Sequence, residues 1–194
     1  MRTCLALLLA VTRFPAGLAA QWSIAPEVGL AAYSGSARDS GGLRVGPTRS
    51  TTLALRVGWE GSRWGAGVRL LYGSTGIGAS DGDLTVIQEH QVRLYEIAGL
   101  VSLRVTRAGA GGDLRLEAGP AYDHWAPTAA ANRSRIGAQA GAEWSFPVTQ
   151  RLVAAVRITG TLSASMFDEG DVPPGAVRRP TWRRGVCFAV RRRL

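Results

Sequence analysis

The sequence contains no lysine and only two histidines and two cysteines, and these scarcities exclude several kinds of site. One cysteine, Cys187, remains once the first twenty residues are removed, so an intramolecular disulfide is impossible. His90 and His124 stand far apart and, with one thiol, do not make a metal site. A lipid hydrolase or acyltransferase needs a nucleophile beside a histidine base that a third group orients. We expect His90 near a loop and His124 at a strand end without a matching serine, so the sequence predicts no catalytic residue, no metal and no cofactor.

Long apolar runs are also absent beyond the N-terminal segment. The longest aliphatic run there is Leu152–Val156, far short of the roughly 18 residues that a membrane helix needs. The N-terminal segment has an early arginine, the apolar run Cys4–Val11 and the small residues Gly17–Ala20. Such a run is too short to span a bilayer core about 30 Å thick, and the pattern is typical of a secretory signal. We expect residues 1–20 to be a cleavable signal peptide and residues 21–194 to form one exported domain.

The charge is strongly basic, with 23 basic residues against 14 acidic ones and a net charge of +9. All the basic residues are arginines, and they are dispersed rather than gathered on one helix or patch. Nucleic acid is the usual partner of so basic a chain, but an exported protein does not meet it. Anionic lipid headgroups, including lipopolysaccharide, are the partner that the charge favours.

The feature that organises the sequence is the alternation of Thr52–Tyr72 with a period of two, which indicates two strands joined by a tight turn at Gly61–Arg63. One face is apolar throughout, and the other is mostly glycine and alanine with single arginines. The apolar face consists of Leu53, Leu55, Val57 and Trp59, followed by Trp64, Ala66, Val68, Leu70 and Tyr72. Small residues suit a crowded interior, and tryptophans beside the turn suit the headgroup level of a bilayer. The segment therefore predicts a hairpin whose apolar face meets lipid.

The same alternation recurs along the chain and predicts six further strands, or eight in all. These strands are Trp22–Tyr33, Val92–Thr106, Leu114–Trp125, Arg135–Phe146, Arg151–Phe167 and Trp182–Leu194. An even number of strands is usual for a single-chain bacterial barrel. The expected fold is all-β, an eight-stranded antiparallel up-and-down transmembrane β-barrel. Pro26 and Pro120 lie inside strands, and we expect a bulge or bend at each because proline removes a ladder donor.

The connections alternate in length, which predicts a topology. Ser34–Ser50 and Gly73–Gln91 are long, whereas the turns after Glu60 and at Pro147–Gln150 are short. Outer-membrane barrels have short periplasmic turns and longer outer loops. Both termini are therefore expected in the periplasm, with Gly35–Arg49 and Val172–Arg179 at the cell surface.

Outward-facing aromatic side chains fall at both ends of the predicted strands, as expected for two belts at the membrane surfaces. The periplasmic belt consists of Trp22, Trp59, Trp64, Trp144 and Phe146. The outer belt consists of Tyr72, Tyr95, Tyr122 and Trp182.

Charged residues occupy many inward positions and predict an ion-paired interior. They are Glu27, Arg56, Arg69, Glu96, Arg104, Arg115, Glu117, Glu143 and Arg157. Unpaired buried charge is costly, and the arginine fork matches a carboxylate, so mutual pairing is expected. Glu27 and Arg56 lie on adjacent strands at similar depth and are the predicted pair. Cys187 is expected to point inward and to serve in packing.

At fold level the chain resembles the small eight-stranded outer-membrane barrels of the OmpA/OmpX-like superfamily, through strand sequences such as Leu116–Tyr122. The resemblance implies a monomer in the outer membrane of a Gram-negative-type bacterium, placed there by the outer-membrane insertion machinery. Such barrels often end in an aromatic residue, whereas this sequence ends in Leu194, with Phe188 as a partial substitute. We expect no peptidoglycan-binding domain after the barrel, so an anchoring role of that kind is not carried over.

The function expected from these features is a structural or surface-interaction role, with a lumen closed by arginine–carboxylate pairs. Three alternatives stay open. The first is a narrow pore or small-ligand carrier across the outer membrane, because an eight-stranded barrel has room for one small ligand. The others are a lipid-modifying barrel enzyme and a soluble lipocalin-like binder, which would place the apolar face inside.

Overall fold

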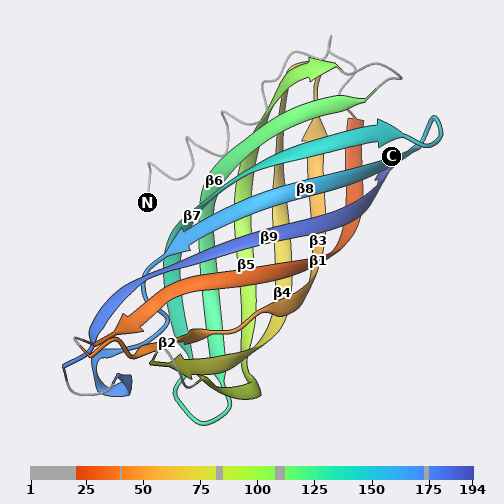
Figure 1. The fold of residues 1–194 in the computed structure, drawn as a ribbon. Coiled ribbons are helices and arrows are strands. Elements are labelled where there is room, and N and C mark those ends of the chain that lie inside the picture. Colours follow the sequence, from red (N-terminus) through yellow and green to blue (C-terminus); the bar gives the residue numbers. More distant parts are fainter. Residues whose placement is uncertain (1–20, 40, 82–84, 108–111, 173–174) are drawn as a thin grey trace.

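The structure is a computed structural model that describes residues 21–39, 41–81, 85–107, 112–172 and 175–194 (Figure 1). The predicted signal peptide, residues 1–20, lies outside this part. The strands are β1 (Gln21–Arg38), β2 (Arg44–Pro47), β3 (Ser50–Glu60), β4 (Trp64–Ser80), β5 (Thr85–Arg107), β6 (Asp113–Pro127), β7 (Arg133–Pro147), β8 (Leu152–Ser163) and β9 (Val177–Arg193). A short 3₁₀ helix, η2 (Glu169–Asp171), precedes β9. No helix within the described residues is long and apolar enough to cross a membrane.

Eight of these strands form a closed antiparallel ring. Each pairs with the next along the chain in the order β1-β3-β4-β5-β6-β7-β8-β9, and β1 pairs with β9 to close it. Figure 1 shows the strands inclined together around one axis. The predicted all-β, up-and-down eight-stranded architecture is confirmed at this level.

The two ends of the barrel differ. At one end, here called the turn end, β3 and β4 are joined by residues 61–63 and β7 and β8 by residues 148–151. The amide of Leu194 donates a hydrogen bond to the carbonyl of Trp22 at 2.9 Å, so β9 ends beside the start of β1 there. The opposite end, here called the loop end, carries β2 and η2.

Two predicted connections at the loop end are more ordered than expected. The predicted loop Ser34–Ser50 contains the end of β1 and the strand β2, which pairs with both β1 and β4. The predicted connection Gly73–Gln91, in which Leu84–Glu89 was expected to extend the next strand, is mostly a hairpin, because β4 continues to Ser80 and β5 begins at Thr85. The extension is confirmed for Thr85–Glu89. The β-branched residues of this hairpin, such as Thr75 and Ile77, favour strand and outweigh its glycines.

Of the bulge or bend predicted at the two prolines, the bulge is wrong: the register does not shift at either proline, although the ladder is interrupted beside each. The β5–β6 register is the same on both sides of Pro120, since Ala98 pairs with Ala121 and Val101 with Ala118. The β1–β9 register is likewise unchanged across Pro26. Register shifts occur instead at Ser34/Ser36, Thr75/Ile77 and Arg104/Thr106. A missing proline donor costs one ladder bond but does not require an extra residue, so the strand stays in register.

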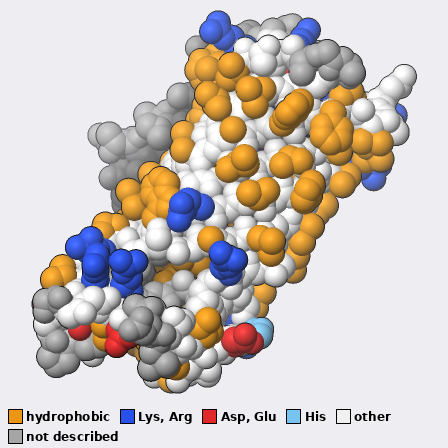
Figure 2. Space-filling view, in the orientation of Figure 1, with side chains coloured by type: hydrophobic (Ala, Val, Ile, Leu, Met, Phe, Trp, Pro, Cys, Tyr) orange, Lys and Arg blue, Asp and Glu red, His pale blue; other side chains and the backbone are white. Residues whose placement is uncertain are grey.

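The outer wall of the barrel is apolar. Leu30 is 69% exposed and Ile136 is 79% exposed, and Figure 2 shows hydrophobic side chains spread over the visible wall. The inward positions of the same strands are charged, polar or small. This arrangement contradicts the lipocalin-like alternative, which requires the apolar residues inside.

Candidate functional site in the barrel interior

The alternation of side chains along each strand sends the charged residues into the barrel. Of the nine charged side chains predicted to face inward, eight are buried and Arg104 is half-buried. The interior also holds charged side chains absent from that predicted set. These are Glu60, Asp113, Asp123, Arg183 and Arg191. The period-two pattern of β3, β6 and β9 already assigns them to the inward face, so strand parity was the signal that could have found them.

Glu143 on β7 lies at the centre of the network. Arg157 and Arg191 donate hydrogen bonds to its two oxygens, and Arg56 Nη1 lies 3.2 Å from Oε2. All four side chains are almost completely buried. Three guanidiniums around one carboxylate leave positive charge that other acidic groups must balance.

Arg157 and Arg56 each reach a second carboxylate. Arg157 Nε lies 3.1 Å from Glu117, and its Nη1 donates to Glu27. Arg56 Nη1 donates to Glu117 at 2.8 Å. These contacts tie β1, β3, β6, β7 and β8 together across the lumen.

A second branch runs toward the loop end. Arg69 Nε donates to Glu27 at 2.8 Å, and Arg69 Nη1 lies 3.5 Å from Glu96. Arg183 donates to Glu96 and, at 2.9 Å, to the hydroxyl of Thr161. The predicted pair of Glu27 and Arg56 is therefore wrong. The stagger of the strands around the ring brings Arg69 to Glu27, and this stagger cannot be read from one hairpin.

A third group of charges lies at the turn end. Arg191 Nη1 is 2.5 Å from Glu60, and Arg115 Nη2 is 3.8 Å from the same carboxylate. Arg104 lies 3.3 Å from Asp113. The ion pairs thus extend from the turn end to the level of Glu96.

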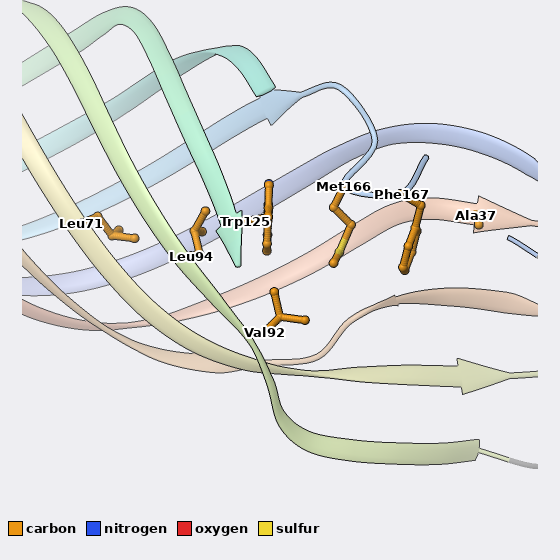
Figure 3. Packing of buried hydrophobic residues seen from close by; sticks show 7 residues of the cluster. All are labelled: Ala37, Leu71, Val92, Leu94, Trp125, Met166 and Phe167. Carbon is orange, nitrogen blue, oxygen red and sulfur yellow. The ribbon is translucent and has the colours of Figure 1, made fainter. Parts of the chain in front are cut away.

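Above Glu96, toward the loop end, the interior becomes apolar. The buried cluster consists of Ala37, Leu71, Val92, Leu94, Trp125, Met166 and Phe167. In Figure 3 these side chains form a row along the barrel axis. The ring of Tyr33 packs edge-on against Trp125, with centroids 6.0 Å apart. The cluster forms an apolar layer over the charged network.

Met166 and Phe167 come from the connection between β8 and β9 rather than from a strand. The prediction that the seventh strand runs to Phe167 is wrong, because β8 ends at Ser163 and the chain then turns into the barrel mouth. We call the segment from Ala164 to Val172 the cap. Two buried apolar side chains are more favourable inside the mouth than on an exposed strand end.

Arginines of β7 hold the cap through ion pairs and hydrogen bonds. Arg133 lies 2.9 Å from Asp168 and 2.7 Å from Asp171, and Arg135 lies 2.6 Å from Asp168. Arg135 Nε also donates to the carbonyl of Ser165 at 2.5 Å. The hydrogen bond from Arg135 and the charges of both arginines hold the pKa of Asp168 below its ordinary value.

The remaining reactive groups do not assemble into a catalytic or metal centre within the described residues. Cys187 is buried with its sulfur 3.5 Å from Glu27, and no cluster of potential ligands is present there. His90 is exposed, whereas His124 Nδ1 lies 3.2 Å from the hydroxyl of Ser134. The expectation that no serine matches His124 is therefore wrong, but no described carboxylate lies within ion-pair distance of this histidine.

The predicted aromatic residues lie near the two ends of the wall. At the turn end, Trp22, Trp64, Trp144 and Phe146 are exposed, while Trp59, the cross-strand partner of Trp22, is half-buried. At the loop end, Tyr72 and Tyr95 are cross-strand partners with ring centroids 5.4 Å apart. Tyr122 and Trp182 are exposed on β6 and β9.

Comparison with known proteins identifies solved structures with a similar fold. No protein-family model and no curated protein sequence matches the chain. Its structure is similar to that of Neisserial surface protein A, with a TM-score of 0.63 and 10% identity over 89% of this chain and 97% of that one. It is also similar to the outer membrane protein OprG of Pseudomonas aeruginosa, with a TM-score of 0.62 and 10% identity over 90% and 96% of the chains. The chain thus has the fold of the small eight-stranded outer-membrane barrels, and at this identity the similarity extends to the fold alone.

Proposed function

We propose that the protein is an outer-membrane β-barrel with a structural or surface-interaction role and without catalytic activity. The observation that carries this proposal is the filled interior. Arginine–carboxylate pairs occupy the lumen from the turn end to Glu96, and the apolar cluster and cap occupy the rest. A barrel of eight strands is narrow, so side chains that fill it leave no wide channel.

The outer wall supports a place in a membrane. Trp64 and Tyr72 lie eight residues apart on β4, which corresponds to roughly 27 Å along the strand. With a strand tilt of about 40° this length spans roughly 21 Å along the membrane normal, slightly less than the apolar band of about 25 Å that such barrels have. The two similar solved structures are named as a surface protein and an outer-membrane protein, in agreement with this location.

The unequal ends of the barrel support an orientation. Short turns face the periplasm in such barrels, and longer connections face outward. In this proposal both termini are periplasmic, residues 1–20 are a cleaved signal peptide, and the outer-membrane insertion machinery assembles a monomer. The excess arginines contact anionic headgroups such as those of lipopolysaccharide.

Conductance measurements on the purified protein in planar bilayers test the closed lumen. The wild-type protein should show no steady ion current, because the charges inside are paired with one another and the mouth is covered. A variant that truncates Glu143, Arg157 and Arg191 to alanine should conduct, which shows that the protein was inserted. A second variant, Met166→Ala with Phe167→Ala, opens the mouth and leaves the network intact.

Membrane insertion is tested separately by heat-modifiable gel mobility and by extraction that requires detergent. Both are expected for every variant that folds. Steady conductance of the wild-type protein, unchanged in the network variant, would contradict the closed lumen and favour the narrow pore.

A further inference from the structure

A groove on the outside of the barrel combines an apolar floor with two arginines. It has a volume of about 630 Å³ and lies at the loop-end part of the wall formed by β3, β1, β9 and β8. Arg49 and Arg184 line it together with Leu30, Ile158 and Val186. Figure 2 shows Lys or Arg side chains, in blue, toward the loop end at the lower left, beside a wall that carries many hydrophobic side chains.

Strand register places the two arginines in one row. Ala32 pairs with Arg184 on β9, and Ala31 pairs with Ser50 on β3, so Arg49 continues β3 beside Ala32. Neighbouring strands are about 4.8 Å apart, which puts the two arginine backbones roughly 10 Å apart with a small side chain between them. We call this row of Arg49, Ala32 and Arg184 the saddle, because the small side chain of Ala32 lies between two guanidinium groups.

Neither arginine has an acidic partner in the described part of the chain. No carboxylate there lies within ion-pair distance of Arg49 or Arg184, although both are on the exposed surface of the barrel. Every buried arginine of the lumen network, in contrast, contacts at least one carboxylate. Two exposed guanidiniums without a described carboxylate partner, at the edge of an apolar wall, are therefore available to an anion from outside the protein.

The next rows toward the middle of the wall are apolar. Leu30 pairs with Val186, which pairs with Ile158, and these three side chains are 47–69% exposed. One row further, Val28 pairs with Phe188, and both are again exposed. The apolar floor thus extends from the two arginines toward the middle of the wall, where the acyl chains of a bilayer lie.

We infer that this groove binds one phosphorylated glycolipid of the outer leaflet, lipopolysaccharide. Its phosphate lies over Ala32 between Arg49 and Arg184, and one acyl chain lies along Leu30, Val186 and Phe188. Arginine presents a fork of donors that suits a phosphate. The inference rests on the proposed place in the outer membrane and adds a defined lipid site to it.

Lipid binding by the purified protein in a neutral detergent tests the site. Diphosphoryl lipid A is titrated and the bound fraction is measured by native mass spectrometry. Arg49→Gln with Arg184→Gln should weaken binding by roughly 30-fold, about fivefold for each guanidinium. Arg93→Gln is the matched control, because Arg93 is an exposed arginine on β5, away from β1 and β9, and this variant should bind like the wild type.

A second variant separates a shaped site from diffuse attraction. Ala32→Trp fills the saddle and keeps both charges, so it should abolish tight binding, whereas attraction by charge alone would survive it. Lipid A without phosphates should bind wild-type and variant proteins equally weakly, and inorganic phosphate alone should not compete at millimolar concentration.

Equal lipid A affinity of the wild type, the double variant and Ala32→Trp would overturn the site, as would effective competition by inorganic phosphate. Failure of the proposed function looks different. In that case the wild-type protein would be extracted from cells without detergent and would lack heat-modifiable mobility, whatever it binds in solution.

Discussion

At the scale of single residues, the interior is governed by the cost of an unpaired buried charge. Glu27 illustrates this, because it is almost completely buried and contacts both Arg69 and Arg157. Removing one partner of a buried ion pair leaves the other charge buried without compensation. Removing both partners eliminates the desolvation cost together with the electrostatic attraction. Pairwise substitutions can therefore identify which partner matters.

Glu27→Gln should destabilise the protein by about 3 kcal/mol, because Arg69 and Arg157 lose their shared carboxylate. Adding Arg69→Met should recover part of this loss. Adding Arg56→Met instead should lower stability further, since Arg56 pairs with Glu117 and Glu143. The measurement is the urea unfolding midpoint of protein reconstituted in lipid vesicles. Equal recovery by the two double variants would contradict the pairing in the structure.

At the lipid-facing positions of the wall, in contrast, apolar side chains stabilise the protein and charged ones destabilise it. Val57 and Val68 are cross-strand partners, each more than 40% exposed. Arginine at either position should cost about 2–4 kcal/mol, the range expected near the bilayer midplane. Arginine at Leu103 or Val156 should cost less, because these residues pair with Trp64 and Trp144 of the turn-end belt. Vesicle-based unfolding measures the loss, with Val177→Arg as a control near the loop end. Neutral effects at both Val57 and Val68 would contradict the lipid-facing parity.

At the scale of elements, the cap between β8 and β9 is the segment whose stability we expect to depend on pH. The cap is held by ion pairs of Asp168 and Asp171 with Arg133 and Arg135, and by the buried side chains of Met166 and Phe167. Ion pairs at an exposed rim respond to protonation, whereas the apolar contacts do not. The two kinds of contact can thus be separated.

The pKa of Asp168 is below its ordinary value of 3.8, mainly because Arg135 donates a hydrogen bond to it. A lowered pKa in the folded protein means that the stabilisation is fully present above the ordinary pKa and is lost as the pH falls through the lower, folded value. Proteolysis of the cap should therefore accelerate only below about pH 4.

Asp168→Asn is the control for this effect. It should show faster cleavage already at pH 7 and a weaker acid dependence, because the ionised carboxylate is absent at every pH. Pepsin digestion in detergent between pH 2 and 4, and a neutral protease at pH 7, provide the measurement. Identical cleavage of the two proteins across this range would show that Asp168 does not hold the cap.

How far the sequence predicts these elements depends on the kind of information each one requires. Alternation along a strand is local, so it predicts the strands, their faces and the inward positions of Arg157 and Glu143. The partner of a charge across the lumen depends on the stagger of all eight strands, which is why Arg69 rather than Arg56 meets Glu27. The cap depends on a non-local contact of Phe167 with the barrel mouth, which no period-two pattern contains.

The sequence also does not predict which side chains of neighbouring strands contact each other, because this depends on the register of the strands. Ser134 lies ten residues from His124 in the sequence, and the β6–β7 pairing makes the two direct neighbours. The prolines show the reverse case. Their local signal predicted bulges at Pro26 and Pro120, but the neighbouring ladder bonds were enough to keep both strands in register.

At the scale of the whole molecule, the difference between the two ends of the barrel makes orientation testable. The turn end has tight connections, and there the end of β9 lies beside the start of β1. The loop end has the cap and β2. Two glycines at the loop end offer sites for inserted tags. Gly42 and Gly175 both have positive φ, and nothing lies within 4 Å of a Cβ added at either.

Epitope tags at Gly42 and Gly175 should be labelled by antibody on intact cells, because the loop end faces outward in the proposed orientation. Tags at Ser62 and Thr149, in the short turns, should be labelled only after the outer membrane is permeabilised. Each tagged protein is first checked for heat-modifiable mobility, so that a misfolded variant is not scored. Labelling of intact cells at Ser62 and Thr149 alone would mean that the barrel is inverted. The lipid groove would then face the inner leaflet, where phospholipid rather than lipopolysaccharide would supply the phosphate for Arg49 and Arg184.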